Sequence, residues 1–316
     1  PPMMKWFLIL FELSVAQNAF RVTEIKINGN TATNEEVIRR EILFTIPSDV
    51  SKLEIENTQK RIESLDLFNS VSYELLAHGE NYTLVYTVSE KFPYYLRPIA
   101  RISKNDVRKL SLGAQVRVSN LTGINNTLDL TFVFGHLWQF SVSYFDPWAF
   151  EASHIFYGLQ MGISKDENPK YEDEFVYNRY SSFVIGKAIT PYFSSSFAGS
   201  IVEKRFHDAE GLGDEQLTNL LINNSLNFSY DLRDLRQNAT SGLHTNLTFV
   251  CTQSLTLEKY RGVGFNFHTE NYTSLGEYVV WMLASDTDHR FGSLLYYQQL
   301  YFSQNNFVRG NAYLGV

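Results

Sequence analysis

Few residues in this 316-residue chain have the types and the spacing that chemistry requires. The sequence contains no Gly-x-Ser-x-Gly, no His-Glu-x-x-His and no phosphate-binding glycine loop, and its seven histidines are scattered without metal-ligand spacing. The single cysteine, Cys251, excludes a disulfide framework and a cysteine-based zinc site. We therefore expect no enzyme activity, no metal and no cofactor.

Two short arginine motifs can organise charge instead. The first contains Asp231, Arg233, Asp234 and Gly242, and the second contains Val308, Arg309 and Gly310. A guanidinium makes forked hydrogen bonds to carboxylate and carbonyl groups, so an arginine can pin a loop to a neighbouring wall, while Gly310 permits a tight turn. The plainer alternatives are charges at a strand–turn junction for the first motif and a solvated loop arginine for the second.

The composition indicates which elements must position these motifs. Phe, Tyr and Trp make up 15% of the chain, whereas charged residues make up only 19%. The net charge of -7, the pI of about 5.6 and the lack of a basic run argue against a nucleic-acid partner. Beyond the N-terminus no apolar window is long enough for a membrane helix. An excess of aromatic residues is typical of membrane β-barrels, which carry aromatic girdles at both water–lipid boundaries.

The first sixteen residues resemble an export signal. Lys5 supplies a positive start, residues 6–11 are apolar, and Ser14 and Ala16 form a small-residue cleavage site. Glu12 interrupts the apolar run, and the alternative is a short buried helix or strand. We predict a signal peptide over residues 1–16 and an exported protein.

Residues 22–90 are predicted to form a small mixed domain of order β-α-α-β-β. A strand at 22–27 ends in a turn at Gly29 and Asn30, and the hairpin strands lie at 68–75 and 82–88. Thr33 and Glu36 have capping-box spacing for the first helix, and the second helix begins near Ser51. The predicted buried stripes are Val37, Ile38, Ile42 and Leu43, and then Leu53, Ile55, Ile62 and Leu65.

Residues 94–286 alternate between apolar and polar or small side chains. We predict strands at 95–104, 110–119, 126–134, 137–145, 153–163, 176–187, 192–203, 217–230, 242–252, 259–272 and 276–286. In a membrane barrel the apolar face meets lipid and the polar face lines the lumen, whereas in a soluble sandwich the apolar face forms a core. Rings near strand ends, as in residues 144–148, favour the barrel.

Several motifs resemble one known family. The matching segments are Ile27–Asn30, Leu67–Val71 and Val88–Glu90 in the small domain, and Asn120–Gly123, Tyr144–Trp148, Asp231–Asp234 with Gly242, and Val308–Gly310 in the remainder. The chain resembles the BamA-like family of outer-membrane assembly factors, the bacterial surface antigens with POTRA domains. The resemblance implies an α+β POTRA domain at 22–90, followed by an antiparallel transmembrane β-barrel at 94–316. Asn311 stands where the family usually carries an aromatic residue, and a proline that is usual near Ala239 is missing.

The resemblance also implies a function. POTRA domains of this family capture unfolded outer-membrane clients by β-augmentation, here on an edge strand at 69–76 with Val71, Tyr73 and Leu75. The barrel seam at 95–104 then templates client insertion into the outer membrane, with the POTRA domain in the periplasm. Implied partners are clients, outer-membrane lipid and accessory lipoproteins. The alternatives are a two-partner-type secretion pore, a passive porin or structural protein, and a mitochondrial or plastid relative.

The family pattern also implies a longer barrel. In the family the Val-Arg-Gly loop folds into the lumen between the eleventh and twelfth of about sixteen strands. Eleven strands followed by a loop leave open edges, which lipid does not tolerate. We therefore expect about five further C-terminal strands, with the acidic partner of Arg309 among them.

Overall fold

The computed structural model describes residues 19–103, 106–149, 154–168, 174–207, 216–236, 238–256, 260–276, 279–293, 301–302 and 314–315. The chain divides into two compact units, one covering Pro1–Lys91 with Asp234–Asn238 and the other Phe92–Arg233 with Ala239–Val316. The predicted signal peptide at 1–16 and the loop motif of Val308, Arg309 and Gly310 lie outside the described residues.

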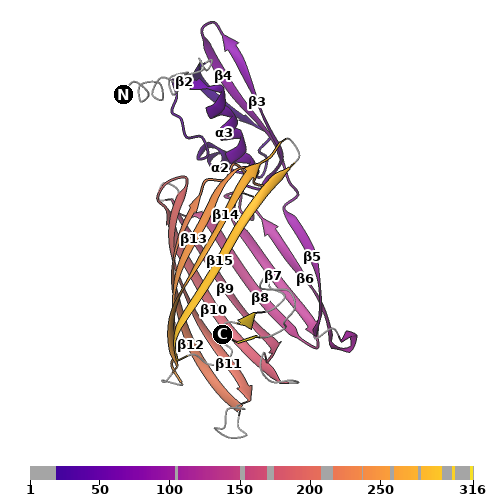
Figure 1. The fold of residues 1–316 in the computed structure, drawn as a ribbon. Helices are drawn as coiled ribbons and strands as arrows, with labels where there is room; N and C mark the ends of the chain where they lie inside the picture. Colours follow the sequence, from indigo (N-terminus) through magenta and orange to yellow (C-terminus); the bar gives the residue numbers. More distant parts are fainter. Residues whose placement is uncertain are drawn as a thin grey trace, which may run out of the picture. The chain divides into compact units, whose positions relative to one another are not determined.

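The first unit contains a four-stranded sheet in the order β2-β1-β4-β3 and two helices (Figure 1). Its elements are β1 (Ala19–Asn28), α2 (Glu35–Arg39), β2 (Ser48–Ser51), α3 (Lys52–Glu63), β3 (Phe68–His78) and β4 (Asn81–Glu90). β1 pairs in parallel with β4, and β3 and β4 form an antiparallel hairpin. The predicted order therefore gains one strand, β2. Four mostly polar residues carry too short a pattern to reveal a strand, and only pairing with β1 makes one.

The helices bury one side against this sheet. Ile38, Ile55 and Ile62 are 0% exposed, and they meet Leu84 and Tyr86 from β4 in one core. Two predicted core residues are wrong, because Leu43 is 53% exposed and Leu53 is 50% exposed. Leu43 follows the end of α2 rather than continuing its stripe, and Leu53 lies in the first turn of α3, on its exposed side.

The capping box belongs to the second helix, not the first. Ser51 Oγ accepts from the Glu54 backbone at 3.3 Å, and Glu54 Oε2 accepts from the Ser51 backbone at 2.8 Å. The predicted box of Thr33 and Glu36 is wrong, since α2 begins at Glu35 after Asn34 without a side-chain cap. The Thr33 backbone instead donates to a carboxylate of β4, described below.

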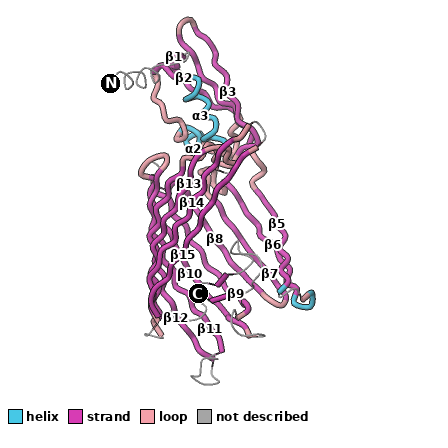
Figure 2. The backbone as a smooth tube through the Cα atoms, in the orientation of Figure 1, coloured by secondary structure: helices cyan, strands magenta, loops and turns pink. Residues whose placement is uncertain are grey.

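The second unit is an eleven-stranded antiparallel sheet in which each strand pairs with its neighbours in the chain (Figures 1 and 2). Its strands are β5 (Tyr94–Ile102), β6 (Leu110–Ser119), β7 (Thr127–Gly135), β8 (Trp138–Ala149), β9 (Ile155–Glu167), β10 (Phe175–Ala188), β11 (Phe193–His207), β12 (Gln216–Asp231), β13 (Gly242–Ser254), β14 (Arg261–Ser274) and β15 (Val280–Ser293). A 3₁₀ turn, η3 (Val107–Lys109), precedes β6, and β16 (Tyr301–Phe302) pairs with β17 (Leu314–Gly315). No described helix has the length and apolarity to span a membrane.

The sheet curves so that one face is concave. Arg101 on β5 donates to the Gln139 side chain on β8 at 3.0 Å, although two strands lie between β5 and β8. Strands are spaced about 4.8 Å apart, so a flat sheet would hold these side chains too far apart to meet. We call the concave face, which carries Arg101 and Gln139, the inner face and the opposite face the outer face.

The register separates polar from apolar side chains between these two faces. One inner row runs Ser143, Gln160, Ser182, Ser200 and Asn223 across five strands, and the neighbouring outer row carries Tyr144, Leu159 and Phe183. Leu159 is 53% exposed and Phe183 is 44% exposed, whereas Asn223 donates to Ser200 at 3.0 Å. The predicted alternation is thereby confirmed, with the apolar side chains on the convex face, as a barrel in lipid requires.

The last long strand differs from its prediction. β15 covers Val280–Ser293 rather than 276–286. The continuous apolar run at 279–283 shows no alternation of apolar and polar side chains. The alternation of this strand lies further along the chain, where Asp286, Asp288 and Arg290 face inward. A run of one residue class carries no period-2 signal, so its boundaries follow from pairing with β14 alone.

Candidate functional site

The turn after β1 is packed directly against β4. Gly29 has a φ of +90°, and a Cβ at this position would lie 2.0 Å from the Val88 carbonyl oxygen. Asn30 Nδ2 donates to the Thr33 carbonyl at 3.1 Å and closes the turn. The two turn residues that the sequence singles out thus form a tight turn in which only glycine fits.

Glu90 at the end of β4 anchors the same turn. Its carboxylate accepts from Thr31 Oγ1 at 2.6 Å, from the Ala32 backbone at 3.0 Å and from the Thr33 backbone at 2.7 Å. Burial by itself raises the pKa of Glu90, but these hydrogen bonds together outweigh it and lower the pKa to about 2. The Gly29-Asn30 and Val88-x-Glu90 segments, which both resemble the family, therefore pack against each other in the structure.

We expect Glu90→Gln to destabilise the first unit at neutral pH. The folded pKa lies below the unfolded value, so the stabilisation is present above about pH 4.5 and is lost as the pH falls towards 2. This difference in pKa between the folded and unfolded states corresponds to about 3 kcal/mol of folding free energy. Because Glu90 is only half-buried, solvent screening reduces the expected loss to about 1 to 2 kcal/mol.

Urea titration with pulse proteolysis of residues 20–91 at pH 7 and at pH 3 measures this loss. The variant should be less stable than the parent at pH 7, and the difference should be smaller at pH 3, where the unfolded Glu90 is protonated and part of the stabilisation is already lost. Glu80→Gln, in the exposed β3–β4 turn, is the matched control. Equal stabilities of parent and Glu90→Gln at pH 7 would contradict the anchoring role.

The predicted client strand is an edge strand. Within the described residues β3 pairs only with β4, so its other side is open. The Val71 side chain is 5% exposed, and Tyr73 and Leu75 also pack against the core. These three side chains therefore hold β3 on the domain, and a partner strand would contact the backbone of β3.

One contact identifies which backbone groups face the open side. Gln59 of α3 donates to the Val71 carbonyl at 2.8 Å, so this carbonyl points away from β4. An antiparallel strand directs the N–H and C=O of one residue to the same side, and the direction repeats every two residues. Tyr73 and Leu75 therefore share the open side with Val71.

The first arginine motif lies on the inner face of the second unit. Arg233 donates through Nε and a terminal nitrogen to both oxygens of Asp231, each at 2.9 Å. The second terminal nitrogen lies 3.5 Å from a Glu270 oxygen on β14. All three side chains are mostly buried, with 14%, 18% and 21% exposed for Arg233, Asp231 and Glu270. Asp234 lies in the connection between β12 and β13.

Gly242 completes the motif through its backbone. It has a φ of +112°, and a Cβ there would lie 2.3 Å from the Leu232 carbonyl oxygen and 2.8 Å from the Arg233 Cα. The start of β13 therefore rests directly on the backbone that carries the arginine. This close approach is the physical reason why a glycine follows an Asp-x-Arg segment here.

Two histidines join the same cluster, which sequence reasoning missed. His268 Nε2 lies 3.1 Å from Glu270 Oε1, and Tyr272 Oη donates to the other Glu270 oxygen at 3.0 Å. His244 faces Glu270 across the β13–β14 register, with Nδ1 at 3.8 Å from that carboxylate. Histidines 24 positions apart show no ligand spacing in a sequence, and only strand register brings them together.

The cluster of His244, His268 and Glu270 has the residue types and the spacing of a metal site, but its surroundings do not favour a metal ion. The ligand atoms of His244, His268 and Glu270 lie within 4.8 Å of one another. However, Glu270 already accepts from Tyr272 and lies beside the Arg233 cation, which repels a metal ion. The charged and hydrogen-bonded groups of β12 and β14 meet here, with His244 of β13 beside Glu270, and we assign the cluster a structural role.

Comparison with known proteins identifies the first unit. Residues 20–91 match the family model of POTRA, described as surface antigen variable number repeat. These residues are a POTRA domain. Among curated proteins no relative matches the chain.

Between 89% and 93% of the chain shares its fold with solved structures of BamA and CdiB. BamA from Haemophilus ducreyi, in a form lacking POTRA domains 1-3, is 13% identical with a TM-score of 0.56, covering 89% of this chain and 58% of that one. CdiB from Escherichia coli is 12% identical with a TM-score of 0.57, covering 92% and 58%. CdiB from Acinetobacter baumannii is 9% identical with a TM-score of 0.53, covering 93% and 57%. The chain thus spans less than two thirds of each matched structure.

A further motif joins the turn between β6 and β7 to strand β8. Asn126 accepts from the Thr122 backbone at 3.0 Å through its side chain and donates to Tyr144 Oη on β8 at 3.0 Å. Asn120 has a φ of +56° and accepts from the Asn125 backbone at 2.8 Å. The Asn-Leu-Thr-Gly segment and the aromatic strand end therefore meet through one buried asparagine.

Proposed function

We propose that this chain acts in the assembly and insertion of β-barrel proteins at the bacterial outer membrane, with its POTRA domain in the periplasm. The observation that carries the proposal is the open edge of β3. The same chain also contains a large sheet whose outer face is apolar. The fold shared with BamA supports it. Its partners are unfolded outer-membrane clients and membrane lipid, with accessory lipoproteins as further candidates. No catalytic step is part of the proposal.

In the proposed mechanism the POTRA domain adds a client strand to its sheet. The backbone groups of Tyr73 and Leu75 on the open side are donors and acceptors that a client strand can use, whereas the Val71 carbonyl already accepts from Gln59. β5 is the corresponding terminal strand of the barrel sheet, and it serves as the seam that templates insertion. Lipid contains no water to satisfy backbone groups, so pairing client strands within the membrane is downhill and requires no nucleotide.

Leu75→Pro is expected to weaken client capture. Proline removes the Leu75 N–H, which faces the open side, and leaves the β3–β4 pairing intact. Losing one backbone bond and stranding its partner costs about 1 to 3 kcal/mol, so a client-strand peptide should bind about tenfold more weakly or worse. Fluorescence anisotropy with a labelled barrel-strand peptide measures the affinity.

The control Leu75→Ala removes the side chain and keeps the N–H, so its affinity should stay close to that of the parent. Circular dichroism checks that both variants remain folded. Equal affinities of Leu75→Pro and the parent would contradict capture by the β3 edge. In liposomes, the chain should also speed the folding of a small barrel client, and ion conductance without such acceleration would favour a porin.

A second candidate is a secretion pore, because the fold is equally similar to that of CdiB. Passage of an unfolded exoprotein into liposomes, without acceleration of client folding, would favour this function. The second arginine motif, Val308 to Gly310, enters both proposals as a lumen loop that stabilises the barrel.

A further inference from the structure

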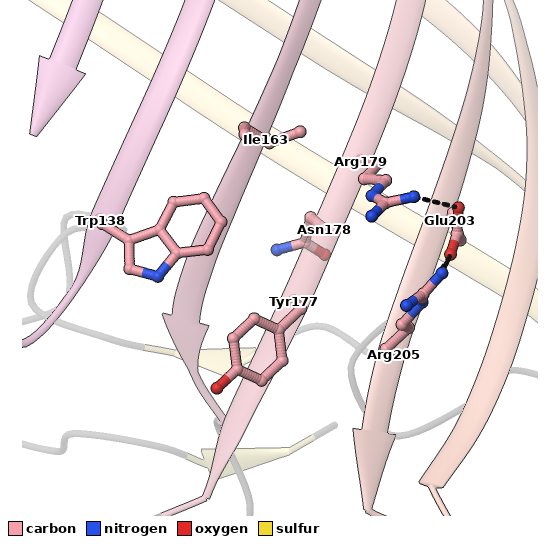
Figure 3. A pocket seen from close by; sticks show the side chains of 7 residues that line it. All are labelled: Trp138, Ile163, Tyr177, Asn178, Arg179, Glu203 and Arg205. Carbon is pink, nitrogen blue, oxygen red and sulfur yellow. Dashed lines mark hydrogen bonds and ion pairs between the residues drawn. The ribbon is translucent and has the colours of Figure 1, made fainter.

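The outer face of the barrel sheet is apolar along most of its length but carries a charged group at one end. Figure 3 shows Arg179 on β10 and Glu203 and Arg205 on β11, beside the rings of Trp138 and Tyr177. The register places these side chains in two adjacent rows. We call this group the outer arginine site.

The rows define how the site lies against the apolar band. One row contains Phe140, Ile163, Arg179 and Glu203, and the row nearer the strand ends contains Trp138, Lys165, Tyr177 and Arg205. The next row inward along the strands is Val142, Met161, Ser181 and Ile201, with no charge. Trp138 is the first residue of β8, so the site lies at the ends of the strands. The boundary between charged and apolar rows therefore falls where a membrane surface is expected.

The charges in the outer arginine site are not balanced. Glu203 lies 2.6 Å from Arg205 and 3.9 Å from Arg179, so one carboxylate serves two guanidinium groups. Arg179 remains 64% exposed and Arg205 47% exposed, which leaves their remaining N–H groups available. These side chains line a hollow of about 310 Å³ together with Trp138, Ile163 and Tyr177. A net positive charge thus faces outward at the edge of an apolar surface.

We propose that the outer arginine site binds the phosphate of an anionic membrane lipid. A planar guanidinium matches phosphate oxygens with forked hydrogen bonds, and a charge that faces lipid is stabilised by a headgroup of opposite sign. Trp138 and Tyr177 supply the amphipathic rings that lie at headgroup level, and Ile163 continues into the apolar band where an acyl chain lies. Glu203 orients both arginines. This inference rests on the proposed membrane-spanning role of the sheet.

The test compares lipid retention by variants of the full chain. The chain is reconstituted in nanodiscs of phosphatidylcholine with a minor share of phosphatidylglycerol, extracted into detergent, and its retained lipids are counted by native mass spectrometry. Arg179→Gln combined with Arg205→Gln should retain about tenfold less phosphatidylglycerol than the parent. Lys187→Gln is the matched control, because Lys187 lies on the same face at the other end of β10, and it should retain as much as the parent.

The following outcomes decide the proposal. Loss of phosphatidylglycerol only in the double variant supports it, and equal retention by all three chains overturns it. Full displacement by millimolar inorganic phosphate overturns the lipid assignment in favour of a free-anion site. If the double variant does not fold, Arg179→Gln alone decides, since Arg179 is the more exposed arginine. Failure of the parent to resist carbonate extraction from liposomes refutes the membrane-spanning role instead, so the two failures are distinguishable.

Discussion

Replacing Gly29 with alanine is expected to unfold the POTRA domain. The new Cβ would lie 2.0 Å from the Val88 carbonyl oxygen, and the φ of +90° is unfavourable for any L side chain. The position of the Cβ is fixed by the backbone and the Val88 oxygen is a backbone atom, so no side-chain rotation relieves the clash. Backbone strain and overpacking together cost about 3 to 5 kcal/mol, which is a large part of the stability of a small domain.

Pulse proteolysis in urea measures this loss on residues 20–91 of the chain. Gly79→Ala is the matched control, because Gly79 also has a positive φ of +66° but a Cβ there meets nothing within 4 Å. It should cost about 1 kcal/mol from strain alone. If the two variants lost equal stability, the packing of the Gly29 turn on β4 would not be the source of the effect.

Arg233→Met is expected to destabilise the barrel sheet. Methionine has a similar reach but no charge, so the change leaves the mostly buried Asp231 and Glu270 carboxylates without their shared cation. Breaking a buried ion pair costs about 3 to 5 kcal/mol. Because the inner face retains some solvent access, the expected loss here is about 2 to 4 kcal/mol.

The temperature at which the folded chain loses its fast mobility in SDS gels measures barrel stability. Arg290→Met is the control, since Arg290 also pairs with an aspartate two residues away, Asp288, but is 30% exposed. Its midpoint should fall less than that of Arg233→Met. Arg233→Lys should not restore stability, because an ammonium cannot make the forked contact with Asp231. A full rescue by lysine would mean that charge alone matters.

Much of the barrel could be predicted because its signal is local. The alternation at 110–119 coincides with β6, and the predicted strand at 242–252 lies within β13. Each of these segments carries its own period of two, which any single stretch of sequence reveals. The turn at Gly29 and Asn30 was equally accessible, because it depends on residue types that turns require.

The sequence by itself therefore determined most of the strands and the polar and apolar faces, and it resembled a POTRA domain in its order of elements except for β2. Only the tertiary structure decided which side chains meet: Glu90 with the Gly29 turn, His244 and His268 with Glu270, and Arg179 with Glu203 and Arg205. It also decided that β2 forms and that the capping box belongs to α3. The physical reason is that strand register is a non-local property. A slip of one residue in the pairing moves every side chain of a strand to the opposite face of the sheet. The sequence of one strand alone therefore does not specify which residues it will face.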